Sequence, residues 1–128
     1  MLYLYDMGFL DDSKKEIITN FVKFVKEELQ IERFPSIILQ NGKGELKTTA
    51  SYDYSDDNKI IRINAKNRAI VDILRSIAHE LSHHRQWEQG ELKVKPPDIG
   101  GVIENTANAK AGIFIKLYGR KDPSIYED

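Results

Sequence analysis

Cysteine is absent from the 128 residues of the chain. Disulfides, thiolate zinc fingers and iron–sulfur clusters are therefore excluded, and a metal site would have to use histidine and carboxylate side chains. The absence also fits a reducing compartment. Since the N-terminal residues MLYLYDMGFLDD contain no early lysine or arginine and turn acidic, they do not look like a secretory signal, and we expect a cytoplasmic protein.

An excess of one charge and a long apolar run are missing as well. The chain has 19 basic and 20 acidic residues and no long run of either sign, which argues against a nucleic-acid partner. No stretch approaches the ~20 apolar residues that cross a bilayer, so we expect no membrane partner. Hydrophobic residues make up 41% of the chain, as in ordinary globular proteins, and the length fits one domain over residues 1–128, which we expect to be a monomer.

The first half of the sequence predicts a helix followed by a small sheet. A short strand is expected at residues 2–5, and apolar residues recur at helical spacing over 13–30, after a capping box formed by Ser13 and Glu16. Three β-rich runs separated by turn signals follow, at residues 36–40, 45–54 and 59–64. Because the connections are short, we expect these three strands to form an antiparallel meander.

The second half predicts two helices. The stronger signal covers residues 67–87, where an apolar stripe is expected to lie on the sheet; the stripe consists of Ile70, Ile73, Leu74, Ile77, Ala78 and Leu81. A last helix is expected over 98–118, capped by Asp98 and stopped by Gly119. Its main apolar stripe is Ile99, Ile103, Ala107, Phe114 and Leu117. Residues 119–128 look like an irregular tail. The predicted helices and strands together indicate the α+β class.

The stretch AHELSHHRQ carries the first sign of chemistry. His79 and His83 stand four residues apart, so on a helix they lie ~40° apart and one turn of ~5.4 Å from each other, opposite the apolar stripe. Two ring nitrogens at this spacing can each approach one zinc ion at ~2.0–2.1 Å. Glu80 points ~100° away from His79 and can lean over a water molecule on the metal, as a general base does. The alternative is a polar helix face that is merely solvated.

A catalytic zinc ion takes three protein ligands and keeps its fourth position open. In the stretch IENTANAKAG, Glu104 and Asn108 lie on one face of the last helix, so Glu104 is the candidate third ligand. Asn108, one turn later, could hold a ligand histidine through its other ring nitrogen. Three other carboxylates compete: Glu88 and Glu91 follow the histidines closely, and Asp98 is expected to cap the helix.

HExxH at 79–83 together with E-x-x-A-N at 104–108 resembles the gluzincin zinc peptidases, in which a downstream helix supplies a glutamate ligand. The ENTAN stretch looks most like the glutamate-helix motif of the ImmA/IrrE-type group, and the small size is similar to the minigluzincins. The resemblance covers the predicted core, residues 35–118. Asn108 departs from the aspartate that thermolysin-like members use at this point.

This resemblance implies a zincin-like fold: an N-terminal helix, a small, mostly antiparallel sheet, an HExxH helix packed on the sheet and a C-terminal glutamate helix. It makes His79, His83 and Glu104 the ligands of Zn²⁺ and Glu80 the catalytic base. It also implies that the strand KIIRIN, residues 59–64, forms the upper edge of the cleft, where an extended peptide would pair by β-augmentation.

The expected activity is that of a zinc metalloendopeptidase that hydrolyses peptide bonds in a peptide or protein substrate. The alternative is a non-catalytic zinc-binding or regulatory module, of phage or host origin, that binds a protein partner. Candidates for a second electrophile at the tetrahedral intermediate are His84, Tyr118 and Tyr126. The acidic tail after residue 119 could fold into the cleft and cover the metal.

Overall fold

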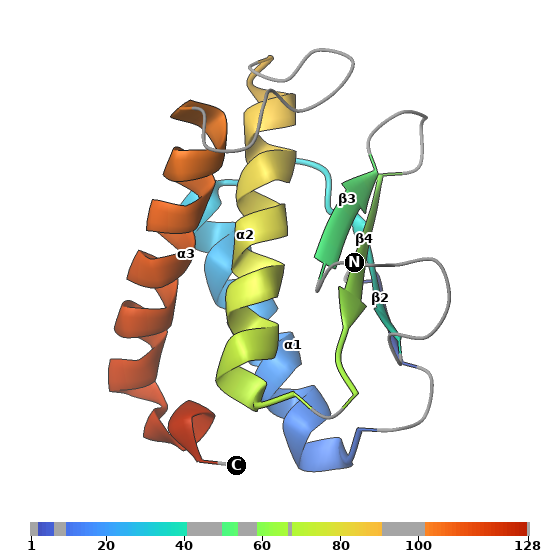
Figure 1. Ribbon diagram of the computed structural model, residues 1–128, viewed down its shortest axis with the longest axis vertical. Coiled ribbons are helices and arrows are strands. Elements are labelled where there is room, and N and C mark those ends of the chain that lie inside the picture. Colours follow the sequence, from blue (N-terminus) through green and yellow to red (C-terminus); the bar gives the residue numbers. More distant parts are fainter. Residues whose placement is uncertain are drawn as a thin grey trace.

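Three helices and a four-stranded sheet make up the described part of the chain (Figure 1). The computed structural model describes residues 3–6, 10–40, 50–53, 59–66, 68–90 and 102–127. The elements are β1 (Tyr3–Asp6), α1 (Asp12–Leu29), β2 (Ser36–Gln40), β3 (Ala50–Asp53), β4 (Ile60–Asn64), α2 (Ile70–Glu88), α3 (Val102–Lys121) and a short 3-10 turn η1 (Pro123–Tyr126). This order confirms the predicted α+β class.

The sheet differs from the predicted meander. Its strand order is β1-β2-β4-β3, with β1 and β4 parallel to β2, and only β3 antiparallel to its neighbour β4. The expectation of a mostly antiparallel sheet is therefore wrong. The burial pattern gives the physical reason: Ile61 and Ile63 of β4 are fully buried, which suits a strand with a neighbour on each side, whereas all four residues of β3 are half-buried.

Helix α1 begins one residue earlier than predicted and has a different cap. The carboxylate of Asp11 accepts hydrogen bonds from the backbone N–H of Lys14 at 2.8 Å and from the hydroxyl of Ser13 at 2.7 Å. Asp11 is therefore the N-cap, and the predicted capping box starting at Ser13 is wrong. The helix ends at Leu29, where Gln30 takes up a left-handed conformation with φ 56°.

Helix α2 is the central element of the fold. It lies between the sheet and α3, with α1 behind it (Figure 1). All six residues of the predicted apolar stripe are buried. Asp72 and Arg75 near the start of the helix are exposed, but the buried set also includes five polar residues of α2: Glu80, Ser82, His83, His84 and Gln86. On the side toward α3, His83 and Gln86 are buried and His79 is half-buried, so this face is not simply solvated.

The C-terminal end of the chain is more ordered than predicted. Helix α3 runs through Gly119 to Lys121, so Gly119 is not a stop signal. A Cβ atom at this position would lie 2.6 Å from the Tyr126 ring, which shows that the glycine provides room for that ring. The turn η1 follows, and its Ile125 is fully buried in the core. Among the helices of the described ranges, none has the length and apolarity needed to cross a membrane.

Candidate metal centre

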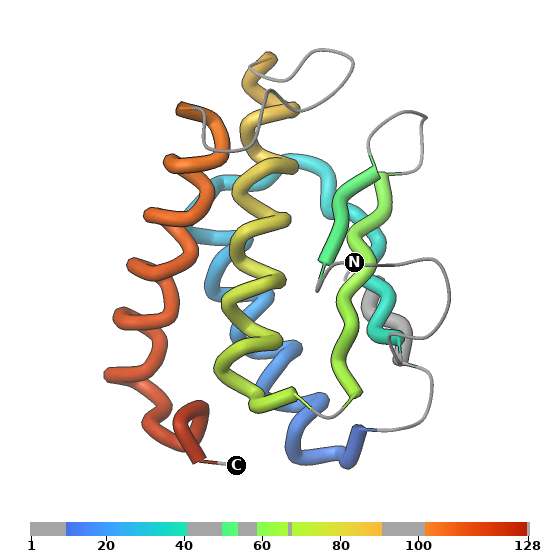
Figure 2. Tube along the Cα trace, in the orientation of Figure 1, coloured from blue at the N-terminus to red at the C-terminus, as the bar shows by residue number. Residues whose placement is uncertain are grey.

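The two histidines and the glutamate singled out in the sequence come together between α2 and α3, which run side by side (Figures 1 and 2). His79 and His83 are on successive turns of α2, and Glu104 is in the first turn of α3. One oxygen of Glu104 lies 2.7 Å from Nε2 of His79, and the other lies 3.0 Å from Nε2 of His83. The two Nε2 atoms are 3.2 Å apart.

The chemistry of these atoms fits a cation. Carboxylate oxygens and unprotonated ring nitrogens are all hydrogen-bond acceptors, and acceptors in contact repel one another unless a proton or a positive ion lies between them. Burial, and next the nearby charge of His83, lower the pKa of His79, which favours the neutral ring with a lone pair. The group His79, His83 and Glu104, whose ligand atoms all lie within 4.8 Å of one another, could hold a metal ion.

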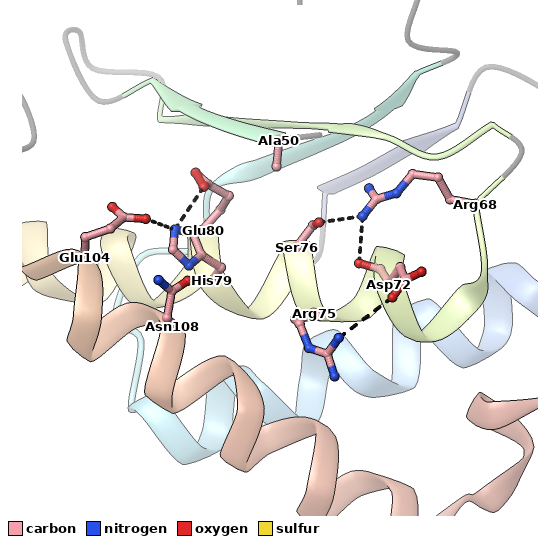
Figure 3. A pocket seen from close by; sticks show the side chains of 9 residues that line it. All are labelled: Ala50, Arg68, Asp72, Arg75, Ser76, His79, Glu80, Glu104 and Asn108. Atoms are coloured by element: carbon pink, nitrogen blue, oxygen red, sulfur yellow. Dashed lines mark hydrogen bonds and ion pairs between the residues drawn. The ribbon is translucent and has the colours of Figure 1, made fainter. Parts of the chain in front are cut away.

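Amide side chains lie beside both histidine rings. Asn108 of α3 lies next to the ring of His79 (Figure 3), and its side chain acts to raise the pKa of that histidine. The Oε1 atom of Gln86 lies 2.8 Å from Nδ1 of His83. Gln86 is not among the residues predicted from the sequence, although its position three residues after His83 on a helix places the two side chains within reach.

Glu80 lies beside the candidate metal ligands without joining them. Its Oε1 atom is 3.8 Å from Nε2 of His79, and the residue is only 7% exposed (Figure 3). Burial, and next the charge of Glu104, raise the pKa of Glu80 to about 8. A cation at the ligand atoms would favour the charged carboxylate again. This position suits a group that exchanges a proton next to a metal ion.

A cavity of about 490 Å³ opens over this group, between β3, α2 and α3. It is lined by Ala50, Arg68, Asp72, Arg75, Ser76, His79, Glu80, Glu104 and Asn108 (Figure 3). At the end away from Glu104, Arg68 donates hydrogen bonds to the carbonyl oxygen of Asn64 at 2.7 Å and to the hydroxyl of Ser76 at 2.9 Å. The cavity thus has Glu80 and Glu104 at one end, and Arg68 and Arg75 together with Asp72 at the other.

Of the competing carboxylates, Glu88 has another role. Its Oε2 atom accepts hydrogen bonds from the backbone N–H groups of Glu32 at 3.1 Å and Arg33 at 2.8 Å, so it holds the segment between α1 and β2. Glu91 and Asp98 lie outside the described residues. Glu104 is therefore the carboxylate that the structure brings to the histidines.

None of the three predicted electrophiles lines the cavity. His84 is buried on the sheet side of α2, where its Nδ1 lies 2.6 Å from the hydroxyl of Tyr52 and its Nε2 contacts the carbonyl oxygen of Arg33. The Tyr118 ring packs edge-on against Phe21, with ring centroids 5.3 Å apart. Tyr126 covers Gly119 at the far end of α3. These three side chains have structural contacts away from the ligand atoms.

The strand at the edge of the cleft and the position of the C-terminal tail both differ from the prediction. The strand KIIRIN, which contains β4, is internal to the described sheet, so it cannot form the edge of the cleft. Strand β3 is the outer strand on the side of the cavity, and its Ala50 lines the cavity. The tail through residue 127 does not cover the candidate ligands. It follows the last turn of α3, whereas Glu104 is in the first turn, and the two lie at opposite ends of the helix (Figure 2).

The fold and the site define an α+β protein with a partly buried histidine–histidine–glutamate group that could hold a metal ion. No protein-family model, curated protein or solved structure matches the chain. The resemblance to gluzincins stays a prediction that depends on the residues at 79–83 and 104–108.

Proposed function

We propose that the protein is a zinc-dependent metallopeptidase of the gluzincin type, similar to the minigluzincins and the ImmA/IrrE-type group. The observation that carries this proposal is the meeting of His79, His83 and Glu104 at one point, with Glu80 beside them in an open cavity. A zincin-like fold is part of the proposal. It is supported by an HExxH helix that lies between a strand edge and a second helix carrying the glutamate.

Zinc is the ion that these ligands suit. Two imidazole nitrogens and one carboxylate, without thiolates, form a common catalytic zinc set, which leaves a position open. When bound, the ion would supply Lewis-acid polarisation of a peptide carbonyl and acidify a water molecule. His79 and His83 would hold it from successive turns of α2, and Glu104 from α3.

Glu80 is the group that would handle the proton. Its carboxylate faces the cavity from the same turn of α2 as His79, and it would accept a proton from the attacking water and return it to the leaving amine. Low exposure keeps bulk water from competing for this proton. An extended peptide that enters the cavity would run between Ala50 of β3 and Glu80 of α2.

Replacing Glu80 by glutamine tests the proposal. The Glu80→Gln protein should bind one equivalent of Zn²⁺ per chain, like the wild type, and should lose at least ~100-fold in the rate of cleaving an unfolded protein substrate, since a general base contributes 10²–10⁴-fold. Metal content by mass spectrometry and cleavage by gel electrophoresis measure the two properties. Glu16→Gln, on the exposed face of α1, is the matched control.

Two results would contradict the proposal in different ways. If Glu80→Gln cleaves the substrate at the wild-type rate, Glu80 is not the base. If the wild type binds Zn²⁺ but cleaves nothing, the alternative of a non-catalytic zinc-binding or regulatory module replaces the peptidase.

A further inference from the structure

Gln86 is a buried polar residue that contacts both halves of the candidate centre. It is only 3% exposed and lies on α2, three residues after His83. Its Oε1 atom is 2.8 Å from Nδ1 of His83, and its Nε2 atom donates a hydrogen bond of 3.1 Å to the carbonyl oxygen of Ile103. Ile103 precedes the ligand Glu104 in the first turn of α3. A single side chain therefore connects a histidine ligand on one helix to the backbone beside the carboxylate ligand on the other.

The carbonyl of Ile103 determines which way the amide of Gln86 faces. A carbonyl oxygen can only accept a hydrogen bond, so the NH₂ group of Gln86 must face Ile103. The amide oxygen then faces His83, and because this oxygen is also only an acceptor, Nδ1 of His83 must carry the proton. In the neutral ring, Nε2 is left with its lone pair, and Nε2 is the atom that lies 3.0 Å from Glu104.

The geometry points to Gln86 as a positioning residue that sets the tautomer of His83 for metal binding. His83 is thus held by the neutral amide of Gln86, and a second neutral amide, that of Asn108, lies beside His79. A neutral acceptor fixes the ring without adding a charge to a site that already contains Glu80 and Glu104. The hydrogen bond to Ile103 orients the amide of Gln86, and the contact with Nδ1 is the one that acts on His83.

This inference depends on the proposed metal centre. Two substitutions separate the contact of Gln86 with His83 from its contact with Ile103. Gln86→Met keeps the size of the side chain but removes both hydrogen bonds. Gln86→Glu keeps an acceptor for Nδ1–H of His83 and removes the donor to Ile103. Gln89→Met, at the exposed end of the same helix, is the matched control. The Kd for Zn²⁺ is measured by competition with a chromophoric chelator, and circular dichroism of each metal-free protein verifies that it is folded.

We expect Gln86→Met to raise the Kd for Zn²⁺ by about 10- to 100-fold, which is typical for the loss of a group that orients a ligand. Gln86→Glu should keep the wild-type Kd or lower it, and Gln89→Met should leave it unchanged. The inference is overturned if folded Gln86→Met binds Zn²⁺ as tightly as the wild type, or if Gln86→Glu is weakened as much as Gln86→Met, since the contact with Ile103 would then be the one that matters.

These outcomes are distinct from failure of the proposed function. A wild-type protein that binds no Zn²⁺ removes the metal centre and this inference together. A wild-type protein that binds Zn²⁺ without cleaving peptides contradicts only the peptidase, and the Kd comparison still decides the role of Gln86.

Discussion

The carboxyl group of Glu80 is buried next to a second carboxylate, and this environment gives a prediction for the metal-free protein. The folded-state pKa of about 8 lies above the ordinary value of 4.5, so the folded chain binds this proton more tightly than the unfolded chain. The stability due to the proton is fully present below the unfolded value, and it is lost as the pH rises through about 8.

We therefore expect the melting temperature of the metal-free wild type to fall relative to that of Glu80→Gln, by roughly 10 °C between pH 6 and pH 9, because the glutamine cannot lose a proton. Calorimetry of both proteins in the presence of a chelator measures the difference. Parallel pH dependences for the two proteins would show that Glu80 does not titrate in this way.

The residues that the sequence identifies are those that helical spacing or the chemistry of a metal site requires. His79, Glu80 and His83 follow from helical spacing, and Glu104 follows from the need for a third ligand. Gln86 could not be found in this way, because its role depends on a carbonyl group that another helix supplies. His84 shows the reverse case, since its neighbours on the sheet are distant in the sequence and turn a candidate electrophile into a buried structural residue.

At the level of elements, the contact between Tyr52 of β3 and His84 of α2 joins the outer strand to the central helix. Nε2 of His84 must donate its proton to the carbonyl oxygen of Arg33, so Nδ1 accepts from the Tyr52 hydroxyl at 2.6 Å. Removing that hydroxyl leaves a buried acceptor without its donor, which costs about 1–2 kcal/mol.

Tyr52→Phe should accordingly lower the melting temperature by ~4–8 °C, as expected for a domain of this size. Thermal unfolding followed by circular dichroism measures the change. Tyr126→Phe, at an exposed ring, is the control and should change the melting temperature little. An equal effect of the two substitutions would argue against the contact between β3 and α2 as a source of stability.

The boundaries of the helices were predictable to within a few residues, but the inward face of α3 and the order of the strands were not. In α3, apolar residues occur on all sides: Leu117, which was predicted to be in the core, is 38% exposed, whereas Ala111, Ile115 and Tyr118 are buried. Spacing alone could not choose between these faces. The strand order depends on which strands pair across the sheet, and the alternation within each strand carries no information about this.

At the scale of the whole molecule, the charges along the cavity suggest a substrate preference, provided that the proposed function holds. The side chain of Arg75 is 55% exposed and forms only a loose pair with Asp72, at 3.8 Å. It lies one helical turn before His79, so the guanidinium group is available to an acidic side chain of a peptide that occupies the cavity.

Arg75→Gln should reduce kcat/KM for peptides with an acidic residue near the cleaved bond by up to about fivefold, since an exposed ion pair contributes at most ~1 kcal/mol. The activity towards matched neutral peptides should change little. Arg120→Gln, at the exposed end of α3, is the control. The preference is disproved if the two substitutions give the same ratio of activities towards acidic and neutral peptides.

The division of the ligands between two helices has a thermodynamic consequence. An ion that contacts His79 and His83 on α2 and Glu104 on α3 binds only when the two helices are docked, so binding and docking are linked equilibria. A free ion concentration of ~1,000 times Kd would add about 4 kcal/mol to the folded state. The concentration of free ion around the protein would then set the fraction of chains that are folded.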